Sequence, residues 1–179
     1  MADAAEKQLT IPVGESDHSQ GNSQAPLILL EYGDYECPYC GEAYSKVKRV
    51  QRELGDNLRF VFRNFPLSQI HPHALSAALA AEAAALQGKF WEMHDMLFEN
   101  QRGLSDANLM AYANALELDF AKFTADMQSD EVQQRVQGDF MSGVRSGVNG
   151  TPTFFINGRR HNGSYDSAAL LAALQEGAE

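Results

Sequence analysis

Two cysteines lie three positions apart in the segment Cys37-Pro-Tyr-Cys40, and they are the only cysteines in the chain. Sulfurs at this spacing can open and close a disulfide, and the thiolate is the species that attacks in such an exchange. Disulfides that only hold a fold together usually come in larger numbers and close longer loops. The pair therefore predicts redox chemistry at the sulfur atoms themselves.

The elements on either side of the pair follow from local patterns. Residues 26–32, Pro-Leu-Ile-Leu-Leu-Glu-Tyr, are apolar apart from Glu31 and predict a buried strand. A helix is predicted from Pro38 to Leu54, because proline suits the first helical position and Gly55 suits the exit.

This placement gives the two sulfurs different surroundings. Cys37 is expected at the helix N-cap, beside unpaired backbone N–H groups and the positive end of the helix dipole, which both stabilise a thiolate. Cys40 is expected one turn further in, shielded and able to resolve a mixed disulfide. Between them, Pro38 lacks an N–H that would have no helical partner, and Tyr39 adds an aromatic surface without charge.

A zinc site and a pair of inert thiols are the alternatives for these cysteines. A closed zinc site needs four ligands. His71 and His73 could supply two of them, but the chain has no second Cys-x-x-Cys segment. We therefore expect neither a metal nor an organic cofactor, since the cysteine pair is itself the redox centre.

Three carboxylates lie close to the pair in sequence. Glu31 belongs to an otherwise apolar strand, where burial raises the pKa of a carboxyl group, so it is expected to exchange a proton with Cys40. Asp34 and Glu36 are expected to be solvated loop charges that disfavour a thiolate nearby.

The rest of the chain predicts an order of elements that continues a strand–helix–strand unit with a right-handed crossover. In chain order these are a strand over 58–65, a helical block over 71–147, a short strand over 153–156, a hairpin turn at Asn157-Gly158, an antiparallel return over 159–161 and a closing helix over 166–174. Leu9–Val13 is expected to form an edge strand.

The helical block carries its own core pattern. Val132, Val136, Phe140 and Val144 recur every four residues and predict one buried helix face. His94 is expected to pack within the fold rather than to bind a ligand.

The composition limits the partners of the chain. The 179 residues include 14 basic and 24 acidic side chains, a net charge of −10, which disfavours nucleic acid and anionic membrane surfaces. No apolar run approaches the ~20 residues of a membrane helix, so membrane insertion is not expected. The first residues lack a basic segment followed by an apolar core. The chain as written is therefore expected in the cytoplasm, or in the periplasm if a leader was removed.

Two motifs in the right order carry a family resemblance. The segments Glu31-Tyr-Gly-Asp-Tyr-Glu-Cys-Pro-Tyr-Cys40 and Gly150-Thr-Pro-Thr-Phe-Phe-Ile-Asn-Gly158, with the helical block between them, resemble the DsbA-like branch of the thioredoxin superfamily. The likeness covers about residues 9–177. It implies an α/β thioredoxin fold (βαβ…ββα) with an inserted helical subdomain. The implied parts are a partly flexible lead-in (1–24), a βαβ half (25–70), the insertion (71–147) and a ββα half (148–179).

The resemblance also implies roles for named residues. Cys37 would be the nucleophile, Cys40 the resolving thiol, and Thr151–Pro152 a cis-proline pair that binds an extended client segment. The strongest oxidants of the family have His where this chain has Tyr39, so a milder oxidant is expected.

The function predicted from sequence is a monomeric protein thiol–disulfide oxidoreductase that exchanges disulfides with cysteine-containing client proteins and with an unidentified redox partner. A glutathione-dependent, glutaredoxin-like reductase is the first alternative, because Cys-Pro-Tyr-Cys is also the usual glutaredoxin motif, although the helical block has no place in that compact fold. A non-catalytic binding module with structural cysteines is the second.

Overall fold

The computed structural model describes residues 7–177, in which five strands and seven α-helices follow one another. In chain order these are β1 (His18–Gly21), β2 (Leu27–Gly33), α1 (Pro38–Leu54), a 3₁₀ turn (Gly55–Asn57), β3 (Leu58–Asn64), α2 (Ala74–Ala85), α3 (Phe90–Glu99), α4 (Asp106–Ala115), α5 (Phe120–Met127), α6 (Asp130–Arg145), β4 (Thr153–Ile156), β5 (Arg159–His161) and α7 (Ser167–Glu176). The parts of the predicted lead-in and C-terminal half that fall on residues 1–6 and 178–179 lie outside the described residues.

The strands form one sheet in the order β1-β3-β2-β4-β5. The central pair, β2 and β3, is parallel, with Leu30 opposite Val61, and every other pair is antiparallel. Asn157 and Gly158 both have positive φ angles, as the predicted hairpin turn between β4 and β5 requires. The predicted strand–helix–strand start and strand–strand–helix end are therefore both present.

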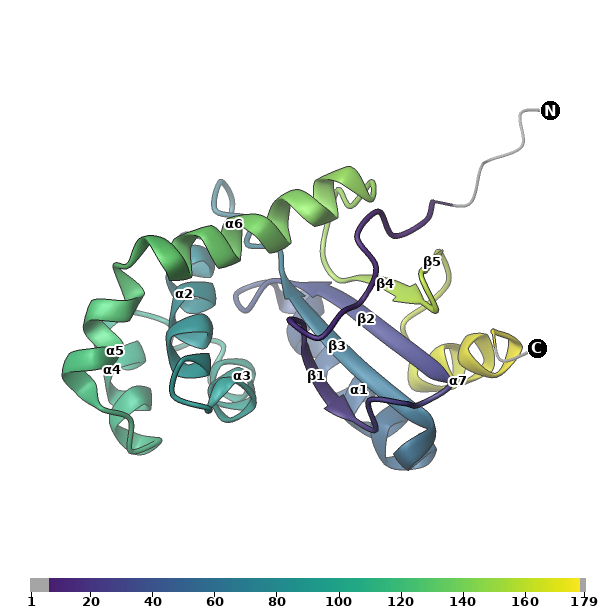
Figure 1. The fold of residues 1–179 in the computed structure, drawn as a ribbon, viewed down its shortest axis with the longest axis horizontal. Helices are drawn as coiled ribbons and strands as arrows, with labels where there is room; N and C mark the ends of the chain where they lie inside the picture. Colours follow the sequence, from purple (N-terminus) through teal and green to yellow (C-terminus); the bar gives the residue numbers. More distant parts are fainter. Residues whose placement is uncertain (1–6, 178–179) are drawn as a thin grey trace.

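The alternation of side chains along β2 divides the core between two faces of the sheet. Leu27 and Leu29 face the larger core, which includes side chains from α1, α2, α3 and α7. Leu30 and Tyr32 face a smaller one, closed by Phe140 of α6 and by Leu9 and Val13 from the N-terminal segment. Figure 1 shows α2 to α5 gathered beside the sheet, and α6 leading back across it towards β4.

Helix α6 follows its predicted pattern for only part of its length. Val132 and Val136 are buried and Phe140 stacks on Phe65, but Val144 is 45% exposed. Four residues turn an α-helix by about 40° more than one full turn, so three such steps rotate the face by about 120°. Residues spaced every four positions therefore do not stay on one buried face, and Val144, the last of them, faces solvent.

The predicted edge strand at Leu9–Val13 is wrong. Among the described residues, the N-terminal segment pairs with the sheet through one isolated bridge, between Gln8 and Arg159, and the two edge strands of the sheet are β1 and β5. Carbonyl groups that a strand would place in a ladder are used otherwise, since those of Ile11 and Pro12 accept hydrogen bonds from Arg63.

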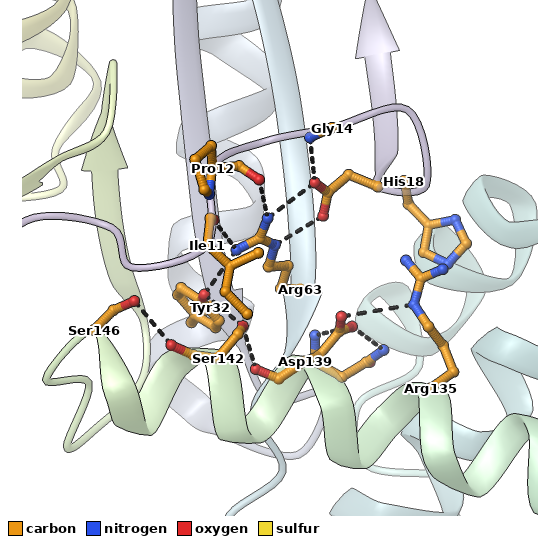
Figure 2. A network of polar contacts seen from close by, with 12 residues as sticks. Ile11, Pro12, Gly14, His18, Tyr32, Arg63, Arg135, Asp139, Ser142 and Ser146 are labelled. Carbon is orange, nitrogen blue, oxygen red and sulfur yellow. Dashed lines mark hydrogen bonds and ion pairs between the residues drawn. The ribbon is translucent and has the colours of Figure 1, made fainter.

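Arg63 holds the N-terminal segment against the sheet. Its guanidinium makes a bidentate ion pair with Asp17 at 2.7 and 2.9 Å, and it also donates to the Tyr32 hydroxyl and to the two carbonyls just named. Both charged side chains are buried. Figure 2 shows the guanidinium enclosed by these groups, with Ser142 of α6 directly below Tyr32.

Both edges of the sheet are covered. On the outer side of β1, the Trp91 indole N–H of α3 donates to the Ser19 carbonyl. On the outer side of β5, the Arg160 N–H donates to the Lys7 carbonyl, and Leu9 N–H donates to Gly158.

Within residues 7–177, none of the helices combines the length and the apolar character that crossing a membrane would take.

Candidate active site

Cys37 lies at the N-cap of α1, where its backbone is still extended (φ −68°, ψ 121°) and Pro38 begins the helix. Its side chain is almost fully covered, at 3% exposure. The thiol donates to the carbonyl oxygen of Thr151 at 3.5 Å, across from the loop that precedes β4. The helix start and the Thr151–Pro152 loop, more than a hundred positions apart in sequence, therefore meet at this sulfur.

The pKa of the Cys37 thiol is lowered to about 5. The largest cause is a hydrogen bond from the Cys40 thiol. Burial opposes it, but the Thr151 side chain and the backbone N–H groups of Cys40 and Tyr39 also favour the thiolate. Cys37 is therefore a thiolate at neutral pH.

Cys40 behaves in the opposite way one turn further along α1. It is fully buried, and the Asp34 backbone N–H donates to its sulfur at 3.5 Å. Burial raises the pKa of this thiol well above its usual value, and the hydrogen bond to Cys37 and the charge of Glu31 add to the effect. Cys40 therefore needs a base before it can attack.

Glu31 is the buried carboxyl group that could act as this base, since its charge acts on Cys40. It extends from β2 on the same face as Leu29, towards α1, and only 2% of it is exposed. Its Oε1 atom has no hydrogen-bond partner among the described residues. Burial, with a smaller contribution from the charge of Cys37, raises the pKa of Glu31 to about 8. The group can therefore hold a proton at neutral pH and release it just above.

Thr151 is the predicted loop residue that contacts the Cys37 sulfur. The peptide bond between Thr151 and Pro152 is cis, and both residues are half-buried. The Thr151 hydroxyl is buried and has no hydrogen-bond partner in the described chain while Cys37 is protonated, so it is free to donate to the Cys37 thiolate. Tyr39, between the two cysteines, is 61% exposed and forms the aromatic surface next to the pair.

The prediction that Asp34 and Glu36 are solvated is wrong. Asp34 is buried, where it accepts from the Leu67 and Glu36 backbone N–H groups and pairs with His71 at 2.7 Å. Glu36 is largely covered and pairs with His73 at 2.8 Å. Histidines 37 residues further along the chain thus face both carboxylates, a pairing that local sequence does not encode.

His94 packs as predicted. It lies within an aromatic cluster that includes Phe62 and Phe98, and its Nδ1 is 3.0 Å from the Tyr35 hydroxyl. Burial holds the pKa of His94 well below its usual value, so the ring is neutral. Within residues 7–177 no group of three or more His, Cys, Asp or Glu side chains could hold a metal ion.

Sequence reasoning missed Gln101, in the turn after α3. Its side-chain amide donates to the carbonyl oxygens of Tyr35 and Cys37. A single polar residue in a turn gives no signal of such a contact, because it depends on how the inserted helices meet α1.

A buried strand that leads into a cysteine pair at a helix start, with helices inserted before the last two strands, defines a domain of the thioredoxin fold. The family model described as Thioredoxin matches residues 14–176, and the chain belongs to that family. Both the predicted family and the predicted α/β fold class are confirmed.

Solved structures agree with this assignment. The chain is similar to BdbD from Bacillus subtilis, with a TM-score of 0.83 and 22% identity over 98% of each chain. It is also similar to a thioredoxin-like oxidoreductase from Silicibacter pomeroyi, with a TM-score of 0.78 and 27% identity over 91% of this chain and 92% of that one.

The curated relatives of the chain are named as antiporters rather than as oxidoreductases. The chain is 45% identical over 165 residues to a protein named Na(+)/H(+) antiporter NhaA 1 from Mycobacterium sp. (strain KMS), a match that spans 91% of this chain and 27% of the relative. A protein of the same name from Salinispora arenicola is 46% identical over 93% of this chain and 26% of its own length. The chain thus spans about a quarter of the length of these relatives.

Proposed function

We propose that this chain is a thiol–disulfide oxidoreductase that exchanges disulfides with cysteine-containing client proteins through Cys37 and Cys40. One observation carries the proposal: two sulfurs one helical turn apart have pKa values shifted in opposite directions, Cys37 downwards and Cys40 upwards. This asymmetry is what an attacking thiol and a resolving thiol require. The fold shared with an oxidoreductase that is 27% identical supports it.

The exchange runs in two balanced steps. In the reducing direction, the Cys37 thiolate attacks a client disulfide, so that a Cys37–client bond forms and one client thiolate leaves. Cys40 then passes its proton to Glu31 and attacks the Cys37 sulfur. The Cys37–Cys40 disulfide forms and the second client thiolate leaves, which reduces the client by two electrons.

Client oxidation is the reverse of these steps. The low pKa of Cys37 makes it a good leaving group, so the same geometry serves both directions. A second thiol–disulfide protein would return the pair to its starting state. The protein would act as a monomer, with the cis-proline loop at Thr151 and Pro152 holding an extended client segment beside Cys37.

Alkylation of the reduced protein tests the assignment of roles. Near pH 6 we expect Cys37 to react much faster than Cys40, because only Cys37 is ionised there. Mass mapping of the labelled peptide identifies the sulfur. The Cys40→Ser variant should accumulate mixed disulfides with a client protein whose disulfide is intact, because Cys37 can attack but no second thiol can resolve the bond. Cys37→Ser, the matched control, should form none.

Three outcomes would contradict the proposal. Preferential labelling of Cys40 would reverse the roles of the two thiols. Turnover with glutathione mixed disulfides but not with protein disulfides would instead favour the glutaredoxin-like alternative, and a Cys37→Ser variant that keeps its activity would favour a binding module.

A further inference from the structure

We propose that Gln101 is a positioning residue that sets the reactivity of Cys37, so that the inserted helices contribute directly to the redox centre. The inference rests on the proposed function, because it concerns the acidity of the attacking thiol. It starts from a contact between two parts of the chain that are 64 positions apart.

The contact is short and two-fold. Gln101 lies between α3 and α4, and its Nε2 donates to the Cys37 carbonyl at 2.6 Å and to the Tyr35 carbonyl at 3.0 Å. The Cys37 carbonyl also accepts the first hydrogen bond of α1, from the Gly41 N–H at 3.1 Å. One side-chain amide therefore joins the loop before the helix to the helix itself.

The Tyr35 and Cys37 carbonyls belong to the backbone segment that determines where the Cys37 sulfur lies. The thiolate is stabilised by groups with fixed positions, which are the Cys40 thiol, the Thr151 loop and the N–H groups of Tyr39 and Cys40. Donors held in place in advance stabilise charge better than donors that must reorient. Without the amide, residues 35–37 would sample more conformations, and the sulfur would meet these donors for less of the time. The pKa of Cys37 would then rise towards that of an ordinary thiol.

The Gln101 amide occupies the position that a Cβ atom on residue 41 would take, and residue 41 is glycine. A Cβ atom on Gly41 would lie 2.2 Å from Gln101 Oε1 and 2.8 Å from its Cδ. Glycine inside a helix is less favourable than alanine, and Gly41 lies in the first turns of α1. The clash would involve the far end of a flexible side chain, so alanine at this position displaces the amide without moving the backbone of α1.

Two variants therefore remove the same hydrogen bonds by different routes. Gln101→Met keeps the length of the side chain but cannot donate, and Gly41→Ala pushes the amide away. Gly138→Ala is the matched control, because Gly138 lies within α6 and a Cβ there meets nothing within 4 Å. The Cys37 pKa is measured from thiolate absorbance against pH in the reduced protein, and Tm is measured on the same samples.

We expect the pKa of Cys37 to rise by about one unit in both Gln101→Met and Gly41→Ala, from its value of about 5. The thiolate fraction, and with it the rate of alkylation, should then fall about twofold near pH 6 and about tenfold near pH 4. Gly138→Ala should titrate like the wild type. The double variant should match the single variants, since one contact can be lost only once. The Tm of Gly41→Ala should not fall below that of Gly138→Ala, because alanine favours the helix.

The inference is overturned if either single variant titrates like the wild type. It is also overturned if the pKa shift in Gly41→Ala comes with a Tm below that of Gly138→Ala, since a structural role would then explain both. A wild-type Cys37 that titrates as an ordinary thiol would contradict the proposed function instead, so the two failures are distinguishable.

Discussion

One helical turn separates two sulfur atoms of opposite acidity, and the cause differs for each. Cys37 gains hydrogen-bond donors at the helix start, whereas Cys40 loses contact with water and faces Glu31. The hydrogen bond between the thiols contributes to both shifts, because it favours the Cys37 thiolate only while Cys40 keeps its proton. The order in which the two thiols ionise therefore follows from the geometry.

The reduction potential of the pair follows from the acidity of Cys37. Its pKa of about 5 lies between the ~7 of thioredoxin and the ~3.5 of DsbA. Those proteins have potentials of ~−270 and ~−120 mV, so we expect roughly −150 to −250 mV here. Equilibration with glutathione measures it. A value near ~−120 mV would show that Tyr39 does not weaken the oxidant and would favour an oxidising compartment.

Replacing Glu31 with Gln should slow the second step of exchange at least tenfold and leave the first step nearly intact, because Cys40 loses its proton acceptor. The pKa of Glu31 is about 8, so its ionised fraction, and with it the wild-type rate of the second step, should rise across that pH. Stopped-flow measurement of both phases against pH tests this. Equal second-phase rates in the variant and the wild type would remove Glu31 from the mechanism.

How far a residue's surroundings could be predicted depended on where its partners lie in the sequence. Cys37, Cys40 and Glu31 have much of their environment in β2 and α1, and local patterns indicated it. Asp34 was misjudged because its partners, Leu67 and His71, come from beyond β3.

At the scale of elements, helices with marked ends were predictable and segments shaped by distant side chains were not. Helix α1 begins at Pro38 and ends at Leu54, as expected from the proline and glycine at its ends. Leu9–Val13 has the composition of an edge strand, yet its course is set by Arg63, a side chain of β3. No sequence pattern within residues 9–13 indicates that Arg63 is their partner.

Arg63 is therefore expected to hold this segment in place. Arg63→Met should lower the free energy of unfolding by about 3–5 kcal/mol, because it leaves the buried Asp17 carboxylate unpaired. Arg63→Lys should recover little, since one ammonium cannot replace a planar group with five donors. Urea unfolding measures both. A loss below about 1 kcal/mol would show that the pair behaves like a surface ion pair.

At the scale of the whole molecule, a buried polar cluster joins the sheet to the inserted helices. Asn64 at the end of β3 donates through its side-chain amide to Glu82 of α2 at 2.8 Å and to Asp139 of α6 at 3.2 Å. His18 of β1 contacts the same Glu82 carboxylate. The order of these elements was predictable, but this docking contact was not, because four separate segments supply it. The subdomain boundaries at residues 71 and 147 stay predictions.

This cluster should make stability depend on pH in a definite direction. Burial, opposed by Arg135, raises the pKa of Asp139 from 3.8 to about 6. Between these values the folded state binds more protons than the unfolded state, so Asp139 costs stability as the pH rises.

The Asp139→Asn variant removes this titration. Its free energy of unfolding relative to the wild type should therefore increase by about 2.4 kcal/mol between about pH 4 and pH 7. Urea unfolding at several pH values measures the difference. A difference that does not change with pH would mean that Asp139 titrates normally in the folded protein.

The covered edges of the sheet have a consequence for a protein proposed to meet unfolded chains. An open edge is a template on which an extended chain can add as a further strand, and such additions can propagate into aggregates. Here Trp91 occupies one edge and residues 7–9 occupy the other. A client bound as proposed would therefore add to the loop beside Cys37 rather than to either edge of the sheet, and Cys40 could break the bond formed there.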